Sequence, residues 1–212
     1  MKALTIIGAG GHGKVVAETA EAVGYTDIAF VDQAWPERQT NGHWRIVGDS
    51  PPHNGDAQSF CAIGANSVRV QIFERFSLWD SPALCHPFAF VSPTARIGAG
   101  SFTAAGTVVN ADAKVGRGVI LNTNCTVEHD CVLDDFVHMS PGSHLAGGVV
   151  IGARSWIGIG AVVREGVRIG SDVVVAINFA AVPEVAEAPM MQALRSDGWA
   201  RPAVPGRGLR NR

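Results

Sequence analysis

The sequence lacks an excess of charge of either sign and has no long apolar run. Its formal net charge is −2 and its pI is near 6.4, so it has no basic surface of the kind that binds nucleic acid, and a nucleic-acid partner is not expected. No run of about 18 apolar residues could span a membrane. Met1 leads directly into an expected strand instead of a secretory signal. These absences predict a cytoplasmic protein without a membrane span.

Cysteine is also scarce, and its spacing does not suit a metal site. The four cysteines show none of the short paired spacings of zinc sites, so no metal is expected. Cys125 and Cys131 stand six residues apart, in the small-residue positions of the repeat described next. We expect both to be packed, reduced thiols, as is usual in the cytoplasm.

What the sequence has in abundance is a repeat of six residues. This period fits neither an α-helix nor the simple alternation of an open sheet. It predicts a parallel β-helix of about five coils, in which three hexads form a triangular coil of eighteen residues and residues eighteen apart stack at about 4.8 Å. A β-sandwich is the weaker alternative, because its turns are spaced irregularly. The repeating positions are Val91, Ile97, Thr103, Val109, Val115, Leu121, Val127, Leu133, Met139, Leu145, Ile151, Ile157, Val163, Ile169 and Val175, and the residue four places after each is mostly small.

The N-terminal part has the pattern of a nucleotide-binding α/β unit. An apolar strand at residues 2–7 runs into Gly8–Gly13, and a helical stretch follows at 14–20. In this context the glycines let backbone N–H groups at a helix N-terminus face a phosphate. A second strand, 27–31, ends in Asp32, where such folds place an acid for ribose hydroxyls. Because the unit is too short for a dinucleotide, we expect half of a nucleotide site.

A second helix is expected at residues 68–78. Its apolar residues Val68, Ile72 and Phe76 recur at helical spacing and are expected to face inward. Residues 35–52 show no regular pattern.

Length and pattern together indicate two domains and a tail. The 212 residues leave room for a compact domain and a prism of about 90 residues. We expect a Rossmann-like α/β nucleotide-binding domain at 1–86, a β-helix domain at 87–182 and an atypical tail at 183–212.

Charged residues gather on the middle coils. Glu128, His129 and Asp130 fall outside the aliphatic and small positions, so their side chains are expected to project outward. A carboxylate holds a neighbouring imidazole in one tautomer and makes it more basic, which suits removal of a proton from an attacking amine or hydroxyl. Gly147 and Gly148, eighteen residues further on, place bare backbone above the histidine, where an N–H could meet an oxyanion. A solvated surface edge is the alternative.

Two further histidines, His138 and His144, also lie outside the inward positions. His138 is nine residues from His129, or one and a half hexads, so stacking within one chain does not bring the two together. A neighbouring subunit would, and a trimer with active sites at its interfaces accounts for histidines on different faces. Purely structural roles for His138 and His144 are the alternative.

Several of these motifs, in this order, resemble the PglD/NeuD-type sugar acetyltransferases. The resemblance implies a left-handed β-helix homotrimer that transfers acetyl from acetyl-CoA to the amino group of a nucleotide-linked sugar, commonly a UDP-linked 4-amino-4,6-dideoxy sugar, for the synthesis of surface glycans. Over residues 1 to about 175, the matching segments are Gly8–Lys14 with Phe30–Asp32, Ala62–Asn66 with Arg69, Gly118–Thr123, Glu128–Cys131 and Phe136–Gly142.

The resemblance also implies roles in the transfer step. His129 matches the general base and Asp130 the acid that raises its basicity, while Glu128 and Asn122 match polar neighbours of that site. A backbone N–H near Gly147 would stabilise the oxyanion. Transfer would be direct, without an acylated residue.

Ligand contacts follow from the same resemblance. His138 matches a histidine that contacts acetyl-CoA, and Ile159 a backbone contact to CoA. The positions that match contacts to the nucleotide-sugar are Gly10, Gly11 and His12 in the glycine loop, Asp32 near the nucleoside, and Gly64.

The C-terminal part departs from the family pattern. Where another glycine-bearing coil is expected, the chain reads Ala176–Ala180, with the bulky Phe179 at a position that is small in the other coils. The contacts to the adenine end of CoA are therefore left open, and no role is assigned to Ile177.

Three other functions remain open at this stage. The first is O-acetyl transfer to a sialic-acid-like sugar with the same base and donor. A nicotinamide-dependent enzyme would instead bind NAD at the glycine loop. The third is a non-catalytic trimeric solenoid that has lost CoA binding.

Overall fold

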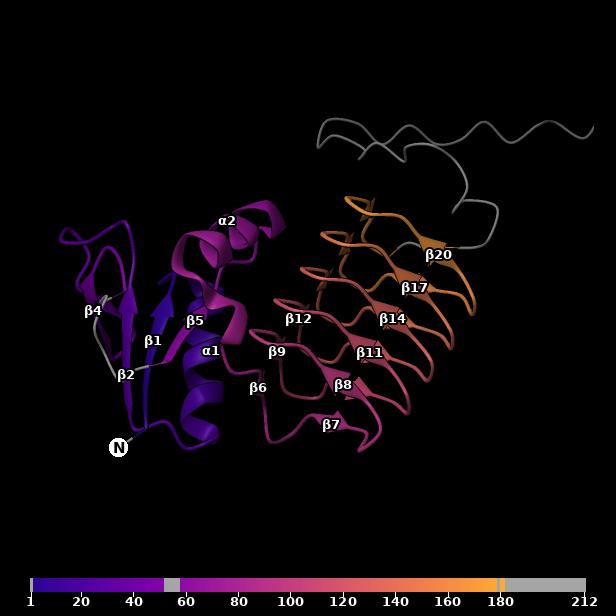
Figure 1. Cartoon of the computed structure of the whole chain (residues 1–212), viewed down its shortest axis with the longest axis horizontal. Coiled ribbons are helices and arrows are strands. Elements are labelled where there is room, and N and C mark those ends of the chain that lie inside the picture. Colours follow the sequence, from indigo (N-terminus) through magenta and orange to yellow (C-terminus); the bar gives the residue numbers. More distant parts are fainter. Residues whose placement is uncertain (1, 52–57, 179, 182–212) are drawn as a thin grey trace, which may run out of the picture.

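The computed structural model describes residues 2–51, 58–178 and 180–181. Figure 1 shows an α/β domain beside a column of stacked coils. Both parts are predicted by the sequence, and the combination of an α/β domain with a parallel β-helix is confirmed. The expected tail and Phe179 lie outside the described residues.

The α/β domain is built on a five-stranded sheet of order β3-β4-β2-β1-β5. Its strands are β1 (Ala3–Ile7), β2 (Asp27–Val31), β3 (Thr40–Asn41), β4 (Trp44–Gly48) and β5 (Gln58–Cys61). All neighbours are parallel except β3 and β4. β3 and β4 lie in the region for which the sequence predicts no element. In β4 only Trp44 and Ile46 alternate inward, and two residues are too short a pattern to predict a strand.

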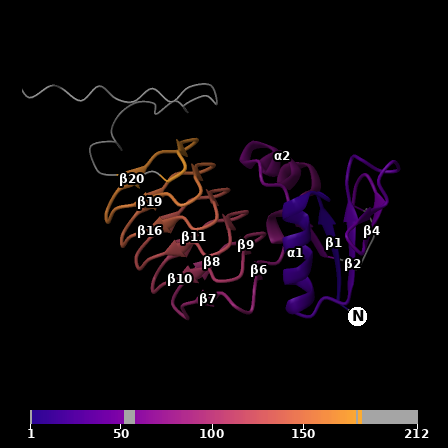
Figure 2. The same ribbon diagram turned by 180° about the vertical axis from the view of Figure 1, so that it is seen from behind.

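Two helices lie between this sheet and the coils, as Figures 1 and 2 both show. α1 (Gly11–Ala22) begins in the glycine loop and buries Val16, Ala17 and Ala20. α2 (Asn66–Phe76) is followed by the short 3-10 helix η1 (Leu78–Asp80).

The inward face of α2 differs from the expected one. Val68 is 41% exposed, and Ile72 and Phe76 are only half-buried. Asn66, Arg69 and Phe73 form the buried face instead. Hydropathy alone predicts the wrong face, because the side chains of Asn66 and Arg69 are buried by donating hydrogen bonds to backbone carbonyl oxygens of the coils.

The coils consist of two-residue strands that stack into three flat faces. The first face contains β7 (Phe90–Val91), β10 (Val108–Val109), β13 (Thr126–Val127), β16 (His144–Leu145), β19 (Val162–Val163) and β22 (Ala180–Ala181). The second face contains β8 (Arg96–Ile97), β11 (Lys114–Val115), β14 (Val132–Leu133), β17 (Val150–Ile151) and β20 (Arg168–Ile169). The third face contains β6 (Leu84–Cys85), β9 (Phe102–Thr103), β12 (Ile120–Leu121), β15 (His138–Met139), β18 (Trp156–Ile157) and β21 (Val174–Val175).

The predicted vertical stacking is confirmed. Strands pair in parallel with partners eighteen residues away, as Val109 does with Val127. In the strands from β7 to β21, the second residue points to the axis, and Leu133 and Met139 are among those that are almost completely buried. The chain turns between the faces at three corners, which we number in chain order: the first corner joins the first and second faces, the second joins the second and third, and the third leads back to the first face.

The α/β domain covers the third face. The ring of His12 on α1 meets Phe102 of β9 edge-on, with the ring centroids 5.2 Å apart. Phe102 and Ile120 belong to the same buried cluster as Leu4 and Phe30 of the sheet domain. The two parts therefore share an apolar core, which sets where the glycine loop lies relative to the coils.

Candidate active site

His129 and Asp130 form a hydrogen-bonded pair at the first corner, just after β13. Nδ1 of His129 lies 2.8 Å from Oδ2 of Asp130, and both side chains are mostly exposed. A carboxylate can only accept, so Nδ1 carries the proton and Nε2 of the neutral ring is left to receive one. The hydrogen bond to Asp130 raises the pKa of His129, with a smaller contribution from the charge of Glu128. This geometry fits a general base, and that role of His129 stays a prediction.

Bare backbone lies directly above the imidazole, as the period of eighteen predicts. A Cβ added to Gly147 would come within 2.6 Å of Cε1 and Nε2 of His129. The Gly148 N–H already donates to the His129 carbonyl oxygen at 2.9 Å, so Gly147 is the better candidate for an oxyanion donor. That role stays a prediction, but the stacking itself is confirmed.

Glu128 has a partner that sequence reasoning missed. Nδ2 of Asn110 donates to Oε2 of Glu128 at 2.6 Å, from one coil below. The signal was available, because Asn110 and Glu128 are eighteen residues apart and occupy the same position in successive coils. Asn110 thus holds the carboxylate next to the His129 site.

Asn122 and Ile159 lie elsewhere in the same chain. Both are at the third corner, separated from His129 by the width of the first face. Oδ1 of Asn122 accepts from the backbone N–H of Thr123 at 2.9 Å, and Ile159 is 56% exposed. The structure therefore does not bring these two residues to His129 within one chain.

The glycine loop has an open approach to its backbone. A Cβ on Gly10 or Gly11 would meet nothing within 4 Å, whereas one on Gly13 would lie 2.4 Å from the Gly8 carbonyl oxygen. The loop thus needs Gly13 for packing and leaves Gly10 and Gly11 free for a ligand at the start of α1.

Polar side chains outside the glycine loop hold it in place. Asp32 accepts from the N–H groups of Ala9 and Ala34, so its carboxylate supports the loop; its contact with a nucleoside stays a prediction. Arg38 donates to the carbonyl oxygen of Ala9 at 2.7 Å, and Asn41 to that of Gly10 at 3.2 Å. Sequence reasoning missed Arg38 and Asn41, which lie in the region without a regular pattern.

His12, Gly64 and His138 meet where the α/β domain covers the third face. Nδ1 of His138 is 3.1 Å from the Gly64 carbonyl oxygen, and its ring stacks on Trp156 with the centroids 4.7 Å apart. Burial is the main cause that lowers the pKa of His138 to about 3 and that of His12 to about 4. Neither ring is charged at neutral pH. The predicted contact between His138 and acetyl-CoA is not tested by this arrangement.

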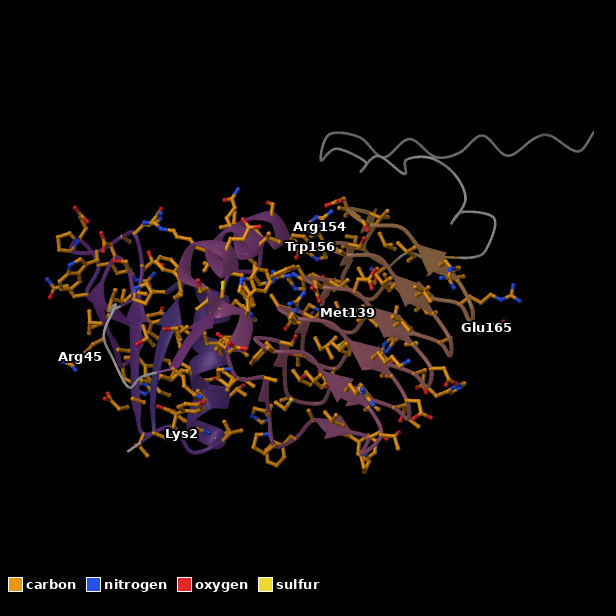
Figure 3. The ribbon with its side chains drawn as sticks, viewed as in Figure 1. Lys2, Arg45, Met139, Arg154, Trp156 and Glu165 are labelled. Carbon is orange, nitrogen blue, oxygen red and sulfur yellow. The ribbon has the colours of Figure 1, made fainter. Side chains whose placement is uncertain are left out.

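His129 and the glycine loop lie on opposite sides of the coils. His129, Gly147 and Glu165 follow one another at eighteen-residue spacing at the first corner. In Figure 3, Glu165 lies on the side away from the α/β domain, and Trp156 and Arg154 lie near α2. One chain therefore cannot present its own glycine loop to its own His129.

Other reactive groups in the described residues do not form a competing site. The four cysteines are free, and burial raises the pKa of Cys125 to about 12. No cluster of three metal-ligating side chains occurs among residues 2–51, 58–178 and 180–181. Within the same ranges, no helix is long and apolar enough to cross a membrane.

Comparison with known proteins places the chain among sugar-modifying enzymes. Residues 3–76 match the model of the PglD N-terminal domain. UDP-N-acetylbacillosamine N-acetyltransferase of Bacillus subtilis (strain 168) is 37% identical over 109 residues, which are 48% of this chain and 50% of the relative. The chain spans about half the length of the curated relatives it matches.

Solved structures match over a longer range. The acetyltransferase domain of PglB from Neisseria gonorrhoeae FA1090 is 41% identical with a TM-score of 0.81, and the match covers 86% of this chain and 92% of that one. A histidine variant of perosamine N-acetyltransferase from Caulobacter crescentus, solved with CoA and GDP-perosamine, is 39% identical with a TM-score of 0.80, and the match covers 86% and 89%. By this identity and coverage, the chain belongs to the PglD-type sugar acyltransferase family.

Proposed function

We propose that the protein is an acetyl-CoA-dependent N-acetyltransferase that acts on the amino group of a nucleotide-linked 4-amino-4,6-dideoxy sugar. The names of its relatives support this substrate class, since they include acetyltransferases for a UDP-linked and a GDP-linked amino sugar. The related PglB domain has been solved with acetyl coenzyme A. The same support does not extend to a sialic-acid O-acetyltransferase, an NAD enzyme or a non-catalytic solenoid.

The observation that carries the proposal is the arrangement of His129, Asp130 and Gly147. Nε2 of His129 accepts a proton as the sugar amine attacks the thioester carbonyl, while Asp130 stabilises the imidazolium. The Gly147 N–H steadies the tetrahedral oxyanion. The C–N bond forms, the C–S bond breaks, and the proton passes from His129 to the departing CoA thiolate. This step requires no metal.

The glycine loop is the proposed site of the nucleotide-sugar. The backbone of Gly10 and Gly11 is open at the start of α1, where N–H groups and the helix dipole favour a diphosphate. Asp32, His12 and Gly64 complete this site in the proposal. We favour uridine as the base of the nucleotide, with guanosine as the alternative that the GDP-linked relatives support.

We further propose a homotrimer in which each site is shared between two subunits. The opposite placement of His129 and the glycine loop supports this, because transfer needs a second copy to supply one of the two. Asn122 and Ile159 at the third corner would reach the site from a neighbouring subunit. A cytoplasmic location is part of the proposal and fits four free thiols.

The test is the release of CoA thiol from acetyl-CoA with three acceptors: a UDP-linked 4-amino-4,6-dideoxy sugar, its GDP-linked counterpart and free sialic acid. His129→Ala is compared with His43→Ala, which removes an exposed histidine of the α/β domain. We expect turnover with an amino sugar, a loss of about 10²–10⁴-fold in His129→Ala, and no change in His43→Ala.

Other results would point elsewhere. Turnover with sialic acid alone would indicate O-acetyl transfer. A ligand at about 100 times its Kd raises the free energy of unfolding by about 2.7 kcal/mol. No thiol release, together with no thermal stabilisation by acetyl-CoA at about 100 times a micromolar Kd, would therefore indicate a solenoid without a donor site. Stabilisation by NAD alone would indicate a nicotinamide enzyme.

A further inference from the structure

Arg69 on α2 is a buried cation to which the proposed function gives no task. Its side chain is 1% exposed, yet its hydrogen-bond partners in the described part of the chain include no carboxylate. A guanidinium has five N–H donors, and each one meets an oxygen. The acceptors are the carbonyl oxygens of Ile63, Gly64, Gly118 and Phe136 and Oδ1 of Asn66, at 2.7–2.9 Å.

These acceptors come from both domains. Ile63 and Gly64 belong to the loop between β5 and α2, whereas Gly118 and Phe136 belong to the second corner of two successive coils. Arg69 therefore ties the loop that carries Gly64 to the coils. A lysine at this position has three donors from a single nitrogen and cannot match this set of acceptors.

The Gly64 carbonyl oxygen serves two donors. It accepts from Nη1 of Arg69 at 2.9 Å and from Nδ1 of His138 at 3.1 Å. Because a carbonyl only accepts, this contact places the imidazole proton on Nδ1 and leaves a lone pair on Nε2. Nε2 of His138 is buried and has no partner in the described part of the chain. Arg69 thus sets the position of the oxygen that determines the tautomer of His138.

The charge of Arg69 acts on the same ring. Burial is the main cause that lowers the pKa of His138 to about 3; the charge of Arg69 adds to this shift, and the bond to Gly64 opposes it. The pKa of Arg69 is itself lowered by burial, to about 10, so it stays charged at neutral pH. The groups that face His138 are Arg69 from α2, His12 from α1 and the stacked Trp156 from β18.

We propose that Arg69 is a positioning residue of the transfer site, which fixes His138 as a neutral hydrogen-bond acceptor by holding the Gly64 carbonyl oxygen against it. In this state Nε2 can only accept, so a substrate group that reaches it must donate, as a hydroxyl or an amine of the sugar does. The kinetic consequence rests on the proposed function; the tautomer does not.

The test compares Arg69→Lys and Arg69→Met with Arg75→Lys. Arg75 lies on the same helix, is exposed and has its guanidinium over the Phe76 ring, so it is a matched control. The ¹⁵N signals of the His138 ring are followed over pH and assigned with His138→Gln, and kcat, KM and Tm are measured alongside. In both Arg69 variants we expect a mixture of His138 tautomers, and in Arg69→Met, which also removes the charge, titration at higher pH. We expect kcat/KM to fall by about 10–100-fold, as when a group that orients a functional histidine is lost.

Three results would overturn the proposal. One is a wild-type His138 with its proton on Nε2 or with an ordinary titration, which can be read even if no Arg69 variant folds. Another is an unchanged His138 spectrum in Arg69→Lys. The third is a loss from Arg69→Lys that is undiminished in the His138→Gln background, because residues that act through one another are not additive. Absence of acetyl transfer by the wild type would refute the proposed function and leave the spectra as the test of Arg69.

Discussion

Two imidazole rings in this protein are each held at Nδ1, with opposite consequences. His129 is exposed and donates to the carboxylate of Asp130, which raises its pKa. His138 is buried and donates to the carbonyl of Gly64 next to Arg69, and its pKa is lowered to about 3. In its neutral form, each ring keeps a lone pair on Nε2. Only His129 has the basicity to take a proton.

Asp130→Asn is expected to move the acid limb of kcat/KM against pH to lower pH. The active base is the neutral ring, so activity is lost as pH falls through the pKa of His129. Asparagine no longer stabilises the imidazolium, and the pKa returns towards its ordinary value of about 6.5. The pH–rate profile is compared with that of Asp135→Asn, which removes the half-buried carboxylate paired with Arg117. A limb that stays in place would show that Asp130 does not set the basicity of His129.

Gly147→Ala is expected to lower kcat by about 10²-fold or more, with a small change in Tm. The added methyl would stand 2.6 Å from the His129 ring and displace it or block the adjacent N–H. Gly170→Ala is the control, because its Cβ would meet only Val173 at 3.9 Å. Steady-state kinetics and thermal melting are measured on both variants. Wild-type kcat in Gly147→Ala would remove this backbone from the transfer step.

At the scale of the element, the coil strands from β7 to β21 direct their second residue to the axis and their first residue outward, where the α/β domain buries those of β9 and β12. On β14, Leu133 is 1% exposed and points to the axis, and Val132 is half-buried on the outer side. Each inner side chain packs against those one coil above and below, so the coils stabilise one another through nearest neighbours. Position within the hexad therefore decides the cost of a substitution more than hydrophobicity does.

Leu133→Ala is expected to lower the free energy of unfolding by about 2–5 kcal/mol, because it leaves a cavity in the axis. Val132→Ala on the same strand is expected to cost at most about 1 kcal/mol. Urea unfolding at one fixed protein concentration measures both, since association adds to apparent stability. Equal costs for the two variants would contradict the assignment of inner and outer positions.

At the scale of the whole molecule, the two halves of the proposed site are on opposite sides of one chain. The α/β domain with its glycine loop covers the third face, and His129 stands at the first corner. A shared site between subunits follows if the protein transfers acetyl as proposed. In that case the partner copy would contribute to the chemistry and not only to stability.

Co-expression of His129→Ala with Gly11→Asp is expected to restore activity that neither variant has alone. Gly11→Asp places a negative charge at an exposed backbone position of the nucleotide loop, where it repels a diphosphate. In randomly mixed trimers, about one quarter of the sites combine an intact base with an intact loop. Specific activity of the purified mixture measures this. A mixture as inactive as its components would mean that each chain builds its own site.

The sequence was informative about the coils and less so about the junction. Gly147 could be placed above His129 by counting eighteen residues, because a parallel β-helix repeats its geometry at every coil. The same count connects Asn110 with Glu128. The predicted inward face of α2 was wrong. An arginine is expected at the surface from its hydropathy, but Arg69 is buried because five acceptors from two domains surround it. The contacts of Arg38 and Asn41 with the glycine loop could not be predicted either, because they join polar side chains to backbone carbonyls about thirty residues away.

By itself, then, the sequence determined the coil architecture, the strand–glycine–helix unit and the His129–Asp130 pair, because each depends on residues that are adjacent or at fixed spacing. Only the tertiary structure decided which face the α/β domain covers, that His138 is buried against Gly64, and that the glycine loop and His129 point in opposite directions. These depend on packing between distant segments, where a shared apolar core and backbone carbonyls outweigh the local preference of each residue.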